Sequence, residues 1–263
     1  MTTLAHHANS KLPAEVHFPN CKEETCIARP AGAEFNRRYG KWFHGNLDHH
    51  DGLVSSQAEL TEAQYNKWRG HHYGLFREPS ARVMSAYRYF RGASGTPENY
   101  ARAASGSMTL QLTGQQHGLV CLLHLGPRCH KKPNMTLALR RLDSFAFVGL
   151  SDAYALSICL FHRQFRTPCL PFELYNSRPT TYNETELTAF RAQLARGVPF
   201  GGCVDAADET LYAHARSRFA RALRDYNVTP HVCAKVCWGT PSDAFKLPPP
   251  MLVRPLSVAP CSA

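Results

Sequence analysis

The residues with the clearest chemical potential lie between 77 and 90, where an arginine-rich segment follows a short apolar run. The apolar run, His72-Tyr-Gly-Leu-Phe76, predicts a buried strand, and Arg77 comes directly after it. Pro79 suits the first turn of a helix, because its fixed φ matches the helix and its missing N–H needs no partner there. Apolar residues then recur at helical spacing: Val83, Met84, Tyr87 and Phe90. The segment therefore predicts a strand, an arginine at its carboxyl end, and a helix.

The order of these elements predicts an anion-binding site. In open α/β sheets, ligands bind at the carboxyl ends of the strands, and a helix N-terminus favours negative charge there. The planar guanidinium of Arg77 matches a phosphate group through paired hydrogen bonds. Ser85 lies two turns into the predicted helix, where its hydroxyl can reach the same anion. The alternative is a basic amphipathic helix whose arginines face only water.

The composition fits one large α/β domain or two small ones, since the chain has 263 residues and enough hydrophobic residues, 44%, for a sizeable core. The formal net charge is +10, from 30 lysines and arginines against 20 aspartates and glutamates. Such a charge suits a nucleotide that bears phosphate and sulfate, a polyanionic glycan or a nucleic acid. The sequence contains no zinc-finger spacing, no aromatic RNA-binding motif and no basic heptads, so we expect no nucleic-acid partner.

Ten cysteines are scattered along the chain. Three pairs are close in sequence and are candidate disulfides, although spacing does not determine connectivity. These pairs are Cys21 with Cys26, Cys121 with Cys129, and Cys233 with Cys237. N-glycosylation sequons begin at Asn134, Asn183 and Asn227. Cysteines and sequons together favour the secretory lumen, and the alternative is a cytosolic protein with free buried thiols.

Strands alternate with helices along the chain, which predicts a parallel sheet covered by helices on both faces. The predicted strands are 41–44, 71–76 and 144–149, and the predicted helices are 1–12, 56–70, 79–91, 108–114, 135–142, 152–165, 185–195 and 208–226. Residues 92–106 are rich in Gly, Ser and Ala and predict a mobile loop. Residues 239–263 are rich in proline and predict a tail without a packed core, which leaves an α/β domain over 1–238.

The spacing R-x-P-x-x-R-x-x-S-x-Y at residues 77–87 resembles the 3′-phosphate-binding motif of sulfotransferases that use 3′-phosphoadenosine 5′-phosphosulfate (PAPS). Segments 108–114, 142–157 and 208–219 resemble Golgi carbohydrate sulfotransferases, especially the heparan and uronyl 2-O-sulfotransferases. The resemblance runs in patches from about residue 41 to 226, and the motif is its specific part. It implies a P-loop-kinase-like α/β fold, with a parallel sheet flanked by helices.

The resemblance also assigns the cofactor contacts. Arg77 and Ser85 are expected to bind the 3′-phosphate of PAPS. The family's 5′-phosphosulfate loop reads approximately K-x-G-x-[ST]-[ST], and Thr2 and Thr3 resemble its end. The strand, lysine and glycine that precede this end in the family are missing here. We therefore expect a sulfotransferase fold that is incomplete at the N-terminus through truncation, with impaired catalysis.

The general base implied by the resemblance is His44, because the 2-O-sulfotransferases carry His-x-His at this place. An imidazole suits proton transfer near neutral pH. The second histidine of that pattern is Asn46 here, and His44 read alone is an ordinary histidine at a strand end. Neighbouring candidates for the base are Asp48, His49 and His50. Ser177 and Arg178 belong to a segment that resembles the loop closing over the cofactor, and the alternative is a solvated loop.

The implied activity is transfer of the sulfuryl group of PAPS to a hydroxyl of a carbohydrate acceptor, a polysaccharide or another glycan. The first alternative is a non-catalytic relative that binds a nucleotide or an anionic glycan. The second is a kinase-like phosphotransferase, which the lack of G-x-x-x-x-G-K-[ST] disfavours. No metal site is expected, because the sequence has no H-E-x-x-H motif and no Cys/His tetrad spacing.

The resemblance places the protein in the Golgi lumen, where a full-length form is membrane-anchored. No signal peptide is recognisable, and no run approaches the roughly 18 apolar residues of a membrane span. We therefore expect the anchor to lie outside this chain. A cytoplasmic location is the less favoured alternative.

Overall fold

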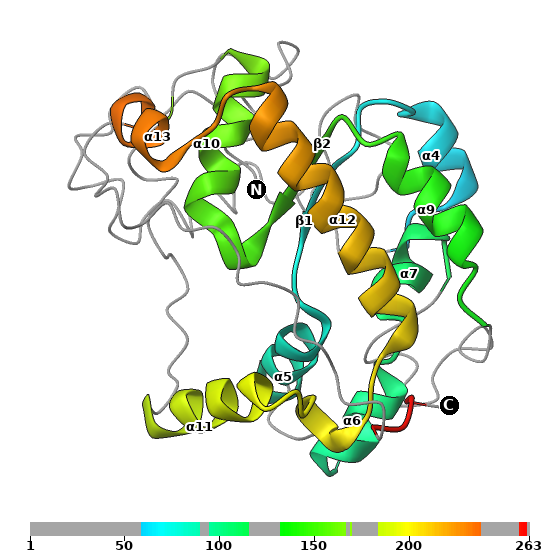
Figure 1. Ribbon diagram of the computed structural model, residues 1–263. Helices are drawn as coiled ribbons and strands as arrows, with labels where there is room; N and C mark the ends of the chain where they lie inside the picture. Colours follow the sequence, from blue (N-terminus) through cyan, green and yellow to red (C-terminus); the bar gives the residue numbers. More distant parts are fainter. Residues whose placement is uncertain are drawn as a thin grey trace, which may run out of the picture. The chain divides into compact units, whose positions relative to one another are not determined.

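The computed structural model describes residues 59–89, 95–115, 132–166, 169, 184–237 and 258–261. These residues divide between two compact units. The first unit contains the described residues of 153–179 and 221–247, and the second contains the others. The described chain is a mostly helical α/β structure with a small two-stranded parallel sheet (Figure 1).

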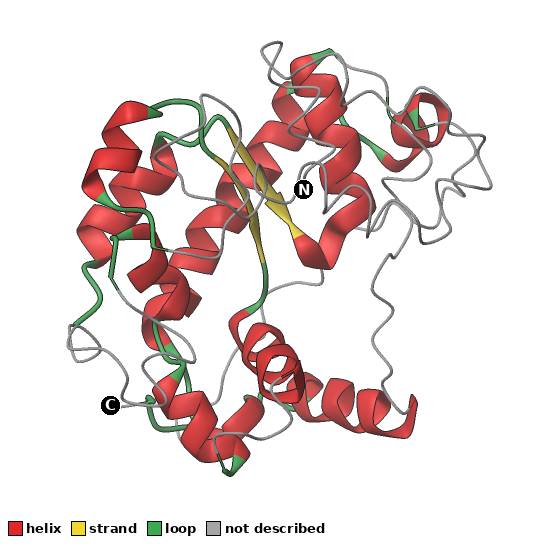
Figure 2. Cartoon of the chain, turned by 180° about the vertical axis from the view of Figure 1, so that it is seen from behind, coloured by secondary structure: helices red, strands yellow, loops and turns green. Residues whose placement is uncertain are grey.

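The sheet lies in the second unit and consists of β1 (Tyr73–Phe76) and β2 (Phe147–Leu150), which run side by side in parallel (Figure 2). Phe76 at the end of β1 lies opposite Leu150 at the end of β2. Every residue of β2 is buried, and so is Phe76. Parallel strands are covered on both faces, so their sequences form continuous apolar runs of the kind seen here.

The helices of the second unit lie before, between and after the two strands in the sequence. They are α4 (Glu62–Lys67), α5 (Pro79–Tyr89), α6 (Pro97–Ala103), α7 (Ser107–Leu112), α9 (Met135–Asp143), α11 (Glu184–Ala195) and the short 3-10 helix η4 (Phe200–Gly202). The long helix α12 (Ala206–Asp225) begins in the second unit and ends in the first. The first unit adds α10 (Tyr154–Phe165) and α13 (Pro230–Val236), and the 3-10 turn η2 (Ser151–Ala153) precedes α10.

The strongly periodic segments are confirmed as elements. Both strands predicted within the described residues form and pair in parallel, and the helices predicted at 56–70, 79–91, 108–114, 135–142, 152–165, 185–195 and 208–226 form with shifted ends. The helix predicted at 1–12 and the strand predicted at 41–44 lie outside the described residues.

Each unit buries its own apolar core. The largest fully buried apolar side chains of the second unit are Leu142, Leu150, Leu211 and Phe219. Those of the first unit are Leu156, Ile158, Leu160 and Phe161.

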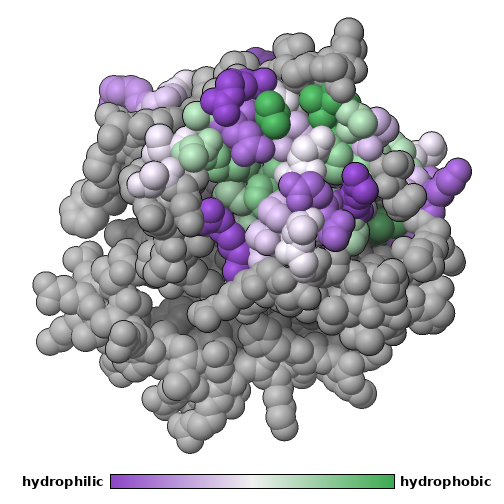
Figure 3. All heavy atoms as spheres, turned by 90° about the horizontal axis from the view of Figure 1, so that it is seen from below, coloured by the Kyte–Doolittle hydropathy of each residue, from purple (hydrophilic) through white to green (hydrophobic). Residues whose placement is uncertain are grey.

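On the face seen in Figure 3, the hydrophobic residues that the structure describes lie among hydrophilic ones.

The prediction of a mobile loop at 92–106 is wrong, because helix α6 occupies Pro97–Ala103. The Thr96 hydroxyl accepts a hydrogen bond from the Asn99 N–H, and Pro97 stands at the first helical position. Tyr100 is buried in a small apolar cluster with residues of α5. Threonine before proline is a helix-start signal, and it outweighs the glycine and serine content on either side.

Helix α13 was not predicted, although it begins with the same signal. The Thr229 hydroxyl accepts a hydrogen bond from the Val232 N–H, and Pro230 follows Thr229. The helix has only seven residues, so it shows little apolar periodicity. Its place in the first unit is fixed instead by two cysteines, Cys233 and Cys237.

Every cysteine that the structure describes takes part in a disulfide. The bonds join Cys159 to Cys233, Cys169 to Cys237, and Cys203 to Cys261. The local pairing considered for Cys233 and Cys237 is wrong, because these residues lie one helical turn apart and each bonds a distant segment. The pairs Cys21 with Cys26 and Cys121 with Cys129 lie outside the described residues.

Three disulfides among the described residues indicate an oxidising compartment of the secretory pathway. Each disulfide closes a loop of 58 to 74 residues. In the chain-entropy model, such a bond lowers the entropy of the unfolded chain and thereby stabilises the folded state by about 4 kcal/mol. In the part of the chain that the structure describes, no helix is both long and apolar enough to cross a membrane.

The end of the proline-rich segment is attached to the second unit. The Val204 N–H donates to the carbonyl of Ala259 at 2.9 Å, and the Cys261 N–H donates to the carbonyl of Val204 at 2.8 Å. The disulfide from Cys261 to Cys203 holds the same place. The domain boundary at residue 238 stays a prediction.

Candidate functional site

The candidate site is at the carboxyl end of β1, where Arg77 leads into α5 (Figure 1). The Arg77 side chain is partly buried. Among the described residues it makes no hydrogen bond and no ion pair. A cation that is partly desolvated and has no protein partner is suited to bind an anion from solution.

The N-terminus of α5 is already occupied by a carboxylate, contrary to the expectation that it contributes to the anion site. The Glu78 side chain accepts a hydrogen bond from the Ala81 N–H at 2.6 Å. The Glu78 N–H in turn donates to the Asp152 carboxylate at 3.1 Å. These contacts pair the N–H groups of Glu78 and Ala81 within the protein. Because the Glu78 carboxylate caps this terminus, Arg77 supplies the main attraction for an anion at this place.

Ser85, the second residue predicted to bind the 3′-phosphate, lies on α5 and is partly buried. Its hydroxyl makes no hydrogen bond among the described residues. It lies six positions after Pro79, which corresponds to about 9 Å along the helix axis. The structure thus keeps Arg77 and Ser85 in one strand–turn–helix unit, and neither side chain makes a hydrogen bond or an ion pair among the described residues.

Asp152, just after β2, and Tyr212 of α12 are two residues near this site that sequence reasoning missed. Asp152 accepts a hydrogen bond from the Tyr212 hydroxyl at 2.6 Å and, with the same oxygen, from the Glu78 N–H. Burial raises the pKa of Tyr212, and the neighbouring charge of Asp152 raises it further, so this phenol stays protonated. The signal that could have found Asp152 is its position, since it follows a buried strand just as Arg77 does.

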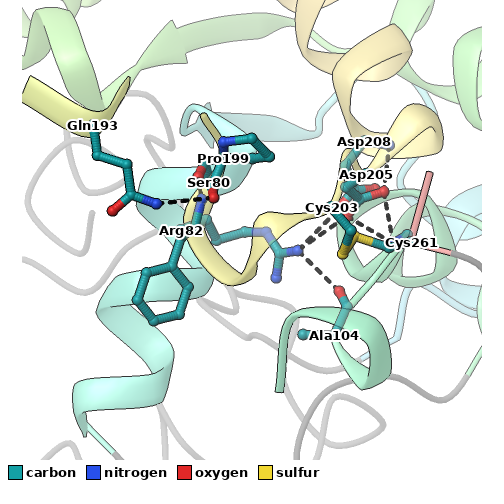
Figure 4. Close-up of a disulfide and its surroundings, with 11 residues drawn as sticks. Ser80, Arg82, Ala104, Gln193, Pro199, Cys203, Asp205, Asp208 and Cys261 are labelled. Carbon is teal, nitrogen blue, oxygen red and sulfur yellow. Dashed lines mark hydrogen bonds and ion pairs between the residues drawn. A yellow bond between two sulfur atoms is a disulfide. The ribbon is translucent and has the colours of Figure 1, made fainter. Parts of the chain in front are cut away.

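Arg82, the second arginine of the motif, is committed to an internal ion pair (Figure 4). Its Nη2 lies 3.0 Å from Asp208 Oδ2 and 3.7 Å from Asp205 Oδ2, and it donates to the carbonyl of Ala104 at 3.0 Å. The Arg82 side chain is 22% exposed, and Asp208 is fully buried. The interpretation that the arginines of this helix face only water is therefore wrong for Arg82.

The same carboxylates satisfy the N-terminus of α7. Gly106 precedes this helix and has no side chain to cap it. Asp208 accepts hydrogen bonds at 2.9 Å from the N–H groups of Met108 and Thr109, and a third from the Thr109 hydroxyl. Asp205 accepts the Gly106 N–H with both oxygens, at 3.0 and 2.9 Å. The start of α12 therefore caps a helix that lies about 100 residues earlier in the chain.

The carboxylates of Asp205 and Asp208 share the single positive charge of Arg82, and the pKa of Asp205 lies above its usual range. Burial raises the pKa of Asp205 to about 7, and the charge of Asp208 is the second cause. The positive charge of Arg82 and the hydrogen bond from Gly106 act in the opposite direction. Asp205 therefore takes up a proton near neutral pH.

The remaining predicted site residues lie outside the described residues. They are Thr2 and Thr3 at the phosphosulfate loop, His44 as the base, and Ser177 and Arg178 in the closing loop. Within the described residues, no three His, Cys, Asp or Glu side chains gather in a way that could hold a metal ion.

Comparison with known proteins finds no matching family model, no similar curated protein and no similar solved structure. The assignment of the site therefore depends on the residues and contacts described above.

Replacing Asp208 by Asn should lower the free energy of unfolding by about 3 to 5 kcal/mol, because Arg82 loses its buried counter-charge. Asp225→Asn removes the same charge from the exposed end of α12 and should change stability by less than about 0.5 kcal/mol. Denaturant unfolding of both variants measures the difference. A loss in Asp208→Asn no larger than in Asp225→Asn would contradict the stabilising role of the ion pair between Asp208 and Arg82.

Because the pKa of Asp205 is raised in the folded protein, we expect the free energy of unfolding to rise as the pH falls. The folded carboxyl keeps its proton up to about pH 7, whereas the unfolded one loses it near 3.8, so the folded state binds more protons between these values. Between about pH 8 and about pH 5 the expected gain is about 2 to 3 kcal/mol. Denaturant titrations should show this gain as the difference between wild type and Asp205→Asn, which keeps the shape without the titrating group. The same pH dependence in both proteins would rule the assignment out.

Proposed function

We propose that the protein is a PAPS-dependent O-sulfotransferase that transfers a sulfuryl group to a hydroxyl of a carbohydrate acceptor. The observation that carries the proposal is Arg77, a partly buried cation without a partner among the described residues, at the carboxyl end of a buried parallel strand. Ser85 follows on the adjoining helix at the spacing of the 3′-phosphate motif.

The contacts around Arg77 support this reading of the motif. Glu78 is the nearest acid in the sequence, and its carboxylate is engaged by the Ala81 N–H. Arg82 is neutralised by Asp208. Arg77 is thus the cation of the motif that stays available for a phosphate, which it binds through paired hydrogen bonds. The Ser85 hydroxyl supplies a further donor to the same group.

The proposed chemistry is an in-line displacement at sulfur. The acceptor hydroxyl attacks the sulfuryl group, and the 5′-phosphate leaves with its electron pair. We assign removal of the hydroxyl proton to His44. Thr2 and Thr3 are assigned to the 5′-phosphosulfate, and Ser177 and Arg178 to the bound nucleotide.

The proposal extends to the type of fold, the cellular location and the charge of the acceptor. The parallel pairing of β1 with β2 supports a P-loop-kinase-like sheet. The disulfides support a lumenal location, which we propose to be the Golgi. The net charge of +10 supports an acceptor that carries negative charge.

Isothermal titration with 3′-phosphoadenosine 5′-phosphate tests the proposal. Arg77→Ala removes charge-assisted hydrogen bonds worth about 1.5 to 3 kcal/mol each, so affinity should fall at least about tenfold. Arg102→Ala removes an equal charge from an exposed position on α6 and should leave affinity nearly unchanged. Equal affinity in Arg77→Ala and wild type, or no binding by the folded wild-type chain, would contradict the proposal.

A further inference from the structure

The turn between α12 and α13, in the first unit, has an asparagine where helices usually end with glycine. Asn227 has a left-handed φ of 49°. Its N–H donates to the carbonyl of Arg224 at 3.0 Å, and the Val228 N–H donates to the carbonyl of Leu223 at 2.7 Å. These two bonds form a Schellman motif, in which the left-handed position is usually glycine and sometimes asparagine.

Some residues of this turn are buried in the core, and others are exposed to solvent. Val228 and Leu223 are buried, at 6% and 7% exposure, as expected for the apolar contact of a Schellman motif. Asn227 is exposed, and its side chain makes no hydrogen bond among the described residues. Thr229 is also exposed and caps α13 with its hydroxyl oxygen as acceptor. An attached group at Asn227 therefore extends into solvent without disturbing the core.

We propose that Asn227 carries an N-linked oligosaccharide. Asn227-Val228-Thr229 is an acceptor sequon, and the disulfides of the same unit, Cys159–Cys233 and Cys169–Cys237, indicate passage through the compartment in which such glycans are added. The site is independent of Arg77, which lies in the other unit.

The transfer uses an oligosaccharide linked to a polyprenyl diphosphate. The amide Nδ2 of Asn227 forms a bond to the anomeric carbon of the first sugar as the bond from that carbon to the diphosphate oxygen breaks. The diphosphate leaves with the electron pair, and the amide proton passes to a base of the transferase. Because the folded turn fixes the backbone of Asn227, we place this step before α12 and α13 fold.

The competing explanation is that both sequon residues serve only the fold. Asparagine tolerates the left-handed conformation, and threonine is a good N-cap. Two substitutions separate the explanations. Asn227→Gly keeps the left-handed turn, and Thr229→Asp keeps a capping oxygen, but each destroys the sequon. A chain with either change should fold and lose the glycan.

The test is site-resolved mass spectrometry of the full chain, secreted from eukaryotic cells behind an added leader. After reduction, trypsin releases residues 225–235 as one peptide, because Arg224 and Lys235 flank the sequon. Release of the glycan by an amidase in heavy-oxygen water should convert Asn227 to labelled aspartate. Asn227→Gly and Thr229→Asp should each lose one mobility step on a gel.

Unmodified Asn227 in the secreted, disulfide-bonded wild-type chain would overturn the proposal. An unchanged gel mobility in both variants would overturn it as well. The other described sequon residue, Asn134, uses its Oδ1 to accept a cap hydrogen bond from the Leu137 N–H, and its separate tryptic peptide keeps the two sites distinct in the measurement.

Discussion

Carboxylates at the start of α12 cap α7 in the interior of the second unit. Asp208 is fully buried and accepts backbone N–H groups from α7 while it pairs with Arg82 of α5. It thereby joins three helices that are up to 126 residues apart in the chain. A buried carboxylate is costly unless its oxygens are fully used, and here the N–H groups, a hydroxyl and a guanidinium use them.

This constraint also decides which residues of the arginine motif remain free for chemistry. Arg82 orients α5 through its bonds to Asp208 and to the carbonyl of Ala104. Glu78 caps the same helix and is held by Asp152, which Tyr212 of α12 also contacts. The strand-to-helix turn is therefore fixed at several points. Arg77, which makes no hydrogen bond or ion pair among the residues that the structure describes, is presented from a rigid support, as a binding residue requires.

The sequence predicted the elements whose apolar pattern is strong, including both strands of the sheet and the helices over 135–142 and 208–226. It did not predict α6 and α13, since both are short and are set by a Thr-Pro start and by contacts with distant residues. The candidate residues Arg77 and Ser85 came from the predicted order of strand, arginine and helix, and from the motif spacing. Asp205 and Asp208 were passed over, because acidic residues at the start of a helix are ordinarily exposed. Their burial depends on contact with α7, and no local sequence pattern reveals this long-range contact.

A thermodynamic cycle on the 3′-phosphate measures directly whether Arg77 binds this group. Wild type and Arg77→Ala are each titrated with 3′-phosphoadenosine 5′-phosphate and with adenosine 5′-phosphate, which lacks the 3′-phosphate. If Arg77 binds that group, removing the 3′-phosphate weakens binding to wild type far more than to the variant, because the two deletions remove one interaction. Equal losses in both proteins would show that Arg77 and the 3′-phosphate do not interact, and would rule out Arg77 as the residue that binds this phosphate.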